Sequence, residues 1–230
     1  MMLCLEAQDE AADHLKTRIT PLTNFIQELI APSTCNEILH SKPTRARTSK
    51  DTDKTLEATF HQSKMYFNHF VKLHDHKAIN RGFLLALVVH DAAGICTDFQ
   101  YRTDIIIPFL YQNTPLQWDD VLALFIQCKN DASYQATPQK HLFDMMDPYH
   151  IQFFNADKKN PVPVIHMVFA LASSTPSVVA LQDAERIQPS RQSAFKANFQ
   201  ANKYTTFDIW CGKASQETFR PIKDDNASFT

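Results

Sequence analysis

Two apolar runs separated by a polar loop place the strongest constraint on how this chain can fold. The runs are DIIIPFLY (104–111) and VLALFIQCK (121–129), and QNTPLQWD (112–119) lies between them. Runs of this length, rich in Ile, Leu and Phe and bounded by turn residues, are typical of paired β-strands. We therefore predict an antiparallel hairpin, and a register centred on the loop pairs Asp104 with Gln127 and Ile106 with Phe125.

This register brings three polar side chains together at one end of the hairpin. Side chains alternate between the faces of a strand, so Gln127 and Lys129 share one face. A charged group beside a core strand needs a partner or access to water. Two interpretations stay open. Either Asp104 and Lys129 form an ion pair that caps the sheet edge, or the hairpin is a hydrolytic site. In such a site Asp104, Gln127 and the Cys128 carbonyl would hold Mg²⁺ or Mn²⁺, and Lys129 would orient the attacking water.

The remaining apolar patterns predict helices and strands around this hairpin. Helical spacing predicts one or two helices within residues 4–31, interrupted near Pro21, and an amphipathic helix over 55–73. Short apolar runs on either side of a polar turn at 98–103 predict a further hairpin. Beyond it we expect a short helix within 136–154 and strands at 163–173 and 205–212, of which 163–173 is a continuous apolar run apart from His166 and Ser173 and is therefore expected to be buried on both faces.

These elements predict an α/β fold with a mixed central β-sheet flanked by helices. We expect a helical N-terminal arm (1–33), a polar linker (34–54), an α/β domain (55–222) and a polar tail (223–230). The segment from 33 to 54 carries five Lys/Arg residues and reads as a solvated linker or as a basic arm that contacts phosphate.

Composition excludes several classes of protein. Only three glycines occur, which is too few for a Walker loop or a dinucleotide fingerprint. A net charge of −2 gives no general attraction to nucleic acid. The five cysteines are odd in number and lack C-x-x-C spacing, which favours a reducing compartment over a disulfide framework. We expect an intracellular protein, cytoplasmic or nuclear, without a membrane span.

The polar residues of the first hairpin resemble the PD-(D/E)xK, or restriction-endonuclease-like, nuclease superfamily. The matching motifs are Arg102-Thr103-Asp104 and Gln127-Cys128-Lys129, within an order of helix, three strands, helix and strand. Residues 60–222 are also similar to a large group of uncharacterised proteins from mushroom-forming fungi. Thr103 stands where the motif has proline, and Gln127 stands where an acid is commoner. The resemblance implies a divalent-metal-dependent nuclease of DNA or RNA, with Asp104, Gln127 and Lys129 as catalytic residues.

Two other functions remain open. A nuclease-like domain without activity could bind nucleic acid or protein. The stretch from Arg186 to Lys223, which interleaves basic residues with four aromatics, is compatible with that function or with an ordinary core and surface. Trp118, in the hairpin loop, is a candidate recognition residue or a residue that covers the sheet edge. The pair His90-Asp91 resembles the metal-binding pair of HD phosphohydrolases, and the further candidate ligands are His74, Asp75 and His76. In contrast, His69 and His166 lie in apolar stretches and are expected to be packed. The sequence leaves oligomeric state open.

Overall fold

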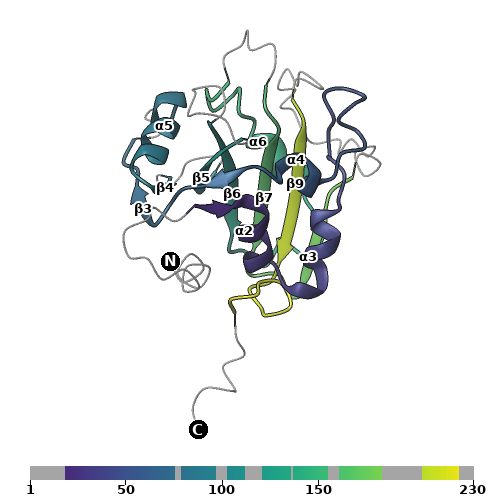
Figure 1. Cartoon of the computed structure of the whole chain (residues 1–230). Coiled ribbons are helices and arrows are strands. Elements are labelled where there is room, and N and C mark those ends of the chain that lie inside the picture. Colours follow the sequence, from purple (N-terminus) through teal and green to yellow (C-terminus); the bar gives the residue numbers. More distant parts are fainter. Residues whose placement is uncertain are drawn as a thin grey trace, which may run out of the picture.

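A curled, mixed β-sheet of nine strands forms the centre of the protein, and helices pack against it (Figure 1). The computed structural model describes residues 19–75, 79–96, 103–111, 121–135, 137–154, 161–182 and 204–222. The elements follow the chain in the order β1 (Thr20–Pro21), α2 (Leu22–Leu29), α3 (Pro32–Leu39), α4 (Leu56–Phe60), β2 (Lys64–Met65), β3 (His69–Lys72), α5 (Arg81–Val89), β4 (Ala92–Ile95), β5 (Ile105–Leu110), β6 (Val121–Lys129), α6 (Lys140–Met145), β7 (Val164–Ala170), β8 (Ser177–Ala180) and β9 (Thr206–Gly212).

The strand order along the main path of the sheet is β1-β2-β5-β6-β7-β9-β8, and β4 pairs with both β5 and β3. β7 is parallel to β6 and to β9, whereas β5 is antiparallel to β6 and to β4. β6, β7 and β9 are buried along almost their whole length, because helices cover both faces of the sheet. The predicted α/β class and the predicted strands at 163–173 and 205–212 are therefore confirmed.

The two faces of the sheet are covered by different helices (Figure 1). On one face, the Phe60 ring of α4 makes edge contacts with Phe109 of β5 and Phe207 of β9, with centroid separations of 5.8 and 5.6 Å. On the other face, Phe83 of α5 packs over Gly94, where a Cβ would lie 3.6 Å from its ring. α6 packs against β7 on that second face. One hydrophobic core joins these helices, together with α2 and α3, to the sheet.

The β5–β6 hairpin has the predicted register. Ile106 pairs with Phe125, and the ladder runs from Ile105 opposite Ile126 to Leu110 opposite Val121. The further hairpin predicted around the turn at 98–103 is confirmed, because β4 pairs antiparallel with β5, with Gly94 opposite Ile106. The loop at 112–120, with Trp118, and the turn at 97–102 lie outside the described residues.

Two predicted elements are wrong. The helix expected over 55–73 ends at Phe60, and β2 and β3 follow, because the aromatic run that contains Phe67 and Phe70 forms extended backbone. The apolar stretch from residue 82 to the turn at 98–103, expected to form the first side of the further hairpin, begins with the helix α5, and only its later part, β4, is a strand. The first turn of α5 is capped by the Asn80 side chain, which accepts a hydrogen bond of 3.1 Å from the Phe83 N–H.

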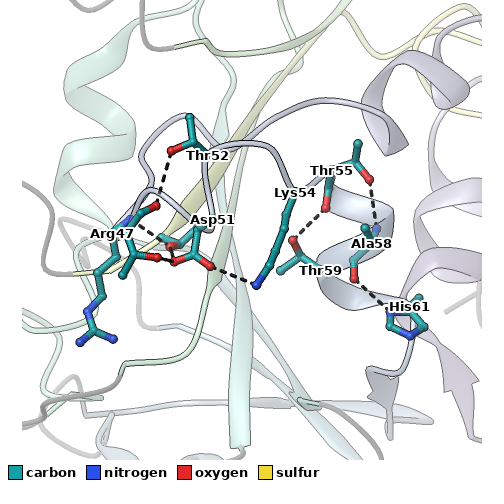
Figure 2. A network of polar contacts seen from close by, with 10 residues as sticks. Arg47, Asp51, Thr52, Lys54, Thr55, Ala58, Thr59 and His61 are labelled. Carbon is teal, nitrogen blue, oxygen red and sulfur yellow. Dashed lines mark hydrogen bonds and ion pairs between the residues drawn. The ribbon is translucent and has the colours of Figure 1, made fainter.

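The interpretation of 34–54 as a solvated linker is also wrong. Its first residues belong to α3, and Arg45 forms an antiparallel bridge with Thr206 beside the end of β8. Asp51 accepts a hydrogen bond from the Thr48 hydroxyl at 2.7 Å. It accepts another from the Lys54 ammonium at 3.2 Å (Figure 2). Burial favours the neutral acid, but these hydrogen bonds lower the pKa of Asp51 below its ordinary value. The segment is joined to the sheet by the Arg47 N–H, which donates to the hydroxyl of Thr205, directly before β9, at 3.1 Å.

Candidate functional site

Asp104 is held at the entrance of β5 by contacts with the backbone of β6. Its backbone N–H donates to the Ile126 carbonyl at 2.8 Å, and its Oδ2 accepts from the Cys128 N–H at 2.6 Å. The buried Thr103 hydroxyl, at the position of the motif's proline, also donates to the Ile126 carbonyl at 3.1 Å. These bonds fix the half-buried Asp104 carboxylate beside β6, between the peptide groups that flank Gln127.

Gln127 and Lys129 lie on the same strand but in different environments. Gln127 is only 2% exposed, and its Oε1 is buried without a hydrogen-bond partner among the described residues. Lys129 is half-buried, and its Nζ lies 5.9 Å from the centroid of the Tyr134 ring. The structure therefore brings Asp104, Gln127 and Lys129 to the same end of the β5–β6 hairpin, where the Gln127 Oε1 has no hydrogen-bond partner among the described residues.

The ion pair considered for this hairpin is not formed. Among the described residues, Asp104 and Lys129 make no salt bridge with each other. The same part of the chain contains no group of three or more His, Cys, Asp or Glu side chains placed to hold a metal ion. A cation at this hairpin would therefore depend on the Gln127 amide and on backbone oxygens in addition to Asp104.

The cysteines near Asp104 are poor nucleophiles. Burial, reinforced by the nearby Asp104 carboxylate, raises the pKa of Cys96 to about 12 and that of Cys128 to about 11. Cys96 is buried, whereas Cys128 is half-buried. Because a thiol needs to ionise to attack or to bind a metal, the contribution left to Cys128 is its backbone carbonyl.

We expect Asp104→Ala to lower the free energy of unfolding by about 1–3 kcal/mol, because the Cys128 N–H loses its charged acceptor in a half-buried position. Asp104→Asn retains an acceptor oxygen and should have a smaller effect. Urea denaturation followed by circular dichroism measures both. Equal losses in the two variants would show that the hydrogen bond to Cys128 does not anchor the Asp104 side chain.

A second polar cluster lies on the sheet face covered by α6, and the sequence analysis did not identify it. The His166 Nδ1 lies 2.9 Å from the Asp208 Oδ1, and both side chains are almost fully buried. Arg45 forms an ion pair with Asp144 of α6. Burial acts against the guanidinium, but the neighbouring Asp208 and Asp144 raise the pKa of Arg45 above its ordinary value. One signal was present in the sequence, since a polar residue interrupts each of the apolar strands β7 and β9.

The other candidates from the sequence are not assembled into sites. His69 is exposed, in contrast to the expectation that it is packed, whereas His166 is packed as expected. His90 and Asp91 follow the last residue of α5, where Asp91 has a φ of 48° and turns the chain into β4. His76 lies outside the described residues. Tyr204 and Trp210 are core residues and are unavailable for stacking on bases, and 183–203 and 223–230 lie outside the described residues.

No helix in the described ranges is both long enough and apolar enough to cross a membrane. Comparisons with protein-family models, with curated proteins and with solved structures found no match to this chain.

Proposed function

We propose that this protein is a divalent-metal-dependent nuclease with a restriction-endonuclease-like core. The support for the core is the order of elements from α5 to β7, which is helix, three antiparallel strands, helix and strand. The last of these strands, β7, pairs in parallel with β6, which carries the Gln-x-Lys motif. In this proposal α2 and α3 belong to the N-terminal helical part of the chain and pack on the face opposite α6.

One observation carries the proposed function. Asp104 precedes β5 by one residue, Gln127 and Lys129 lie at the end of β6, and the antiparallel register brings the three together. Within this group the Gln127 Oε1 is an acceptor without a partner among the described residues, and Asp104 uses one carboxylate oxygen for the Cys128 N–H. Oxygen donors of this kind fit Mg²⁺ or Mn²⁺. Asp104, Gln127 and the Cys128 carbonyl are therefore the proposed ligands.

Each residue then has a separate chemical task. When bound, the cation supplies Lewis-acid stabilisation of a phosphodiester oxygen. The backbone contacts of Asp104 hold its carboxylate in one orientation, which places the free oxygen without further ordering. The Lys129 ammonium orients the attacking water and stabilises the negative charge that builds on the phosphate. The proposed partner is accordingly DNA or RNA.

The HD-phosphohydrolase alternative has no support in the fold. That family is helical, whereas His90 and Asp91 lie between α5 and a strand of a β-sheet, and His90 is exposed. The alternative of a nuclease-like domain that binds without cleaving keeps the same fold, so an activity measurement has to separate it from the nuclease.

The test is a cleavage assay with purified wild-type protein, single- and double-stranded DNA and RNA, and Mg²⁺, Mn²⁺ or EDTA. We expect cleavage of at least one substrate with Mg²⁺ or Mn²⁺ and none in EDTA. Either cation should also raise the melting temperature of the wild type and leave that of Asp104→Asn unchanged, because ligands stabilise only the state that binds them. A folded wild-type protein that cleaves none of these substrates would contradict the proposal and favour a binding module.

A further inference from the structure

The carboxyl ends of three parallel strands meet at one edge of the sheet, which includes the end of the β5–β6 hairpin. β6, β7 and β9 run in the same direction, and Lys129, Ala170 and Gly212 pair side by side where these strands end (Figure 1). Ligands of open α/β sheets bind outside the carboxyl ends of the strands, where the connecting loops leave the sheet. A substrate that reaches Lys129 therefore also meets the loops that follow β7 and β9.

Lys213 directly follows β9 and lies next to the end of β7. Its backbone N–H donates to the Ala170 carbonyl at 2.9 Å. On the other side of β7, the Leu171 N–H donates to the Lys129 carbonyl at 2.8 Å. Lys129 and Lys213 thus flank the end of one strand. Because neighbouring strands are about 4.8 Å apart, the backbones of the two lysines are separated by roughly 10 Å.

The turn that carries Lys213 has an unusual backbone conformation. Lys213 has a φ of 64°, in the left-handed region that favours glycine. The glycine of this turn is instead at 212, where a Cβ would lie 2.5 Å from the Ser177 Oγ. The Thr218 hydroxyl donates to the Gly212 carbonyl at 2.6 Å and closes the loop between them. A lysine kept at a position that suits glycine better indicates that its side chain has a function.

The charge of Lys213 is not neutralised by an acid in the described part of the chain. Lys213 is half-buried and has no ion pair there, and neither has Lys129. In contrast, four other basic residues form ion pairs with acids: Lys42, Arg45, Lys54 and Arg220. Two unpaired cations at this spacing fit the backbone of a nucleic acid, which carries one phosphate about every 3.4 Å along each strand, so that they span about three nucleotides.

We propose that Lys213 is a positioning residue for nucleic acid, whose ammonium binds a backbone phosphate about three nucleotides from the one at Lys129. The substrate strand then crosses the carboxyl ends of β6, β7 and β9 and not the β4 side of the hairpin. This inference rests on the proposed function for the phosphate at Lys129, and it adds the path of the substrate over the sheet.

The test measures binding of single- and double-stranded DNA and RNA to the full chain by fluorescence anisotropy across a salt series. Lys213→Gly removes the ammonium and suits the positive φ, so the variant should fold. We expect it to reduce the slope of log K against log salt by about 0.7–0.9, the change for one phosphate contact. Lys213→Arg should retain the slope. Glu217→Gln, which removes an exposed acid from the same loop, should tighten binding.

Kinetics of cleavage give a second measurement. Lys213→Gly should raise KM and leave kcat nearly unchanged, because the contact is made equally in the bound substrate and in the transition state. Lys50→Ala is the matched control. It removes an exposed lysine from the segment that joins Thr206 at the amino end of β9, and it should change neither the salt slope nor KM.

The outcomes separate the path of the substrate from the nuclease activity. Equal changes in Lys213→Gly and Lys50→Ala would overturn the role of Lys213 in favour of a general charge effect. A wild type that cleaves, with an unchanged salt slope and KM in Lys213→Gly, would overturn the path and leave the nuclease intact. A wild type that binds without cleaving, with a reduced slope in Lys213→Gly, would support the path and overturn the nuclease. A wild type that binds no nucleic acid would overturn both.

Discussion

Replacing Arg45 with methionine is expected to lower the free energy of unfolding by about 3–5 kcal/mol, because it leaves a buried carboxylate without its partner. The Arg45 and Asp144 side chains that form this ion pair are only 9% and 24% exposed. Asp208 is also close enough to raise the pKa of Arg45, so the substitution leaves two acids near each other. The backbone bridge between Arg45 and Thr206 does not depend on the side chain and should persist.

The loss should depend on pH. Burial raises the pKa of Asp144 above its ordinary value, whereas Arg45 and Lys140 lower it, so the pKa rises further when Arg45 is removed. A carboxyl whose pKa is raised in the folded state contributes stability below its pKa in the unfolded chain. That contribution is lost as pH rises through the folded-state pKa. The deficit of Arg45→Met should therefore be largest near neutral pH and should shrink in acid, as Asp144 takes up a proton.

Urea denaturation across a pH series measures both effects. Lys42→Ala is the control, because it removes a basic partner from the Lys42–Asp53 pair in the same segment, where the side chains are 61% and 83% exposed. Exposed pairs of this kind contribute little to stability. The double variant Arg45→Met/Asp144→Leu should recover part of the loss, since it removes the unpaired acid as well. A deficit of Arg45→Met that does not change with pH would show that Asp144 is not its cause.

The position of Arg45 shows what the sequence could not predict. A polar segment with many basic residues resembles a solvated linker by composition, and nothing local indicates that Asp144 and Asp208 will surround one of its arginines. These three residues are far apart in the chain, and only the assembled sheet brings them together. In contrast, the hairpin register followed from two apolar runs and the loop between them, because strand pairing across a short loop is a local property.

The incorrect strand prediction for the residues of α5 has a different physical cause. The run at 82–89 is apolar throughout, so it lacks the periodicity that distinguishes a helix from a buried strand. The Asn80 cap and the helix-favouring Leu and Ala residues decide in favour of a helix. The helix that precedes the three strands of the proposed nuclease core is therefore α5 and not the helix expected over 55–73. The site residues Asp104, Gln127 and Lys129 keep their places on the hairpin.

In a nuclease, Lys129→Ala is expected to lower cleavage by about 100- to 1,000-fold, the loss typical of removing one group that stabilises charge in the transition state. Stability should change little, because Lys129 makes no ion pair with Asp104 and its contact with the Tyr134 ring is at 5.9 Å. Affinity for nucleic acid should also be nearly retained, since one ammonium is a small part of a phosphate-binding surface.

The matched control is Lys140→Ala, which removes one positive charge from an exposed lysine on the neighbouring α6. Cleavage rates under single turnover, with melting temperatures and binding measured on the same proteins, separate the possible roles. Equal loss of cleavage in both variants would assign Lys129 a general electrostatic effect and contradict its role at the attacking water. Weaker nucleic-acid binding by Lys129→Ala but not by Lys140→Ala, with no cleavage by the wild type, would instead identify this hairpin as part of a binding surface on an inactive nuclease-like fold.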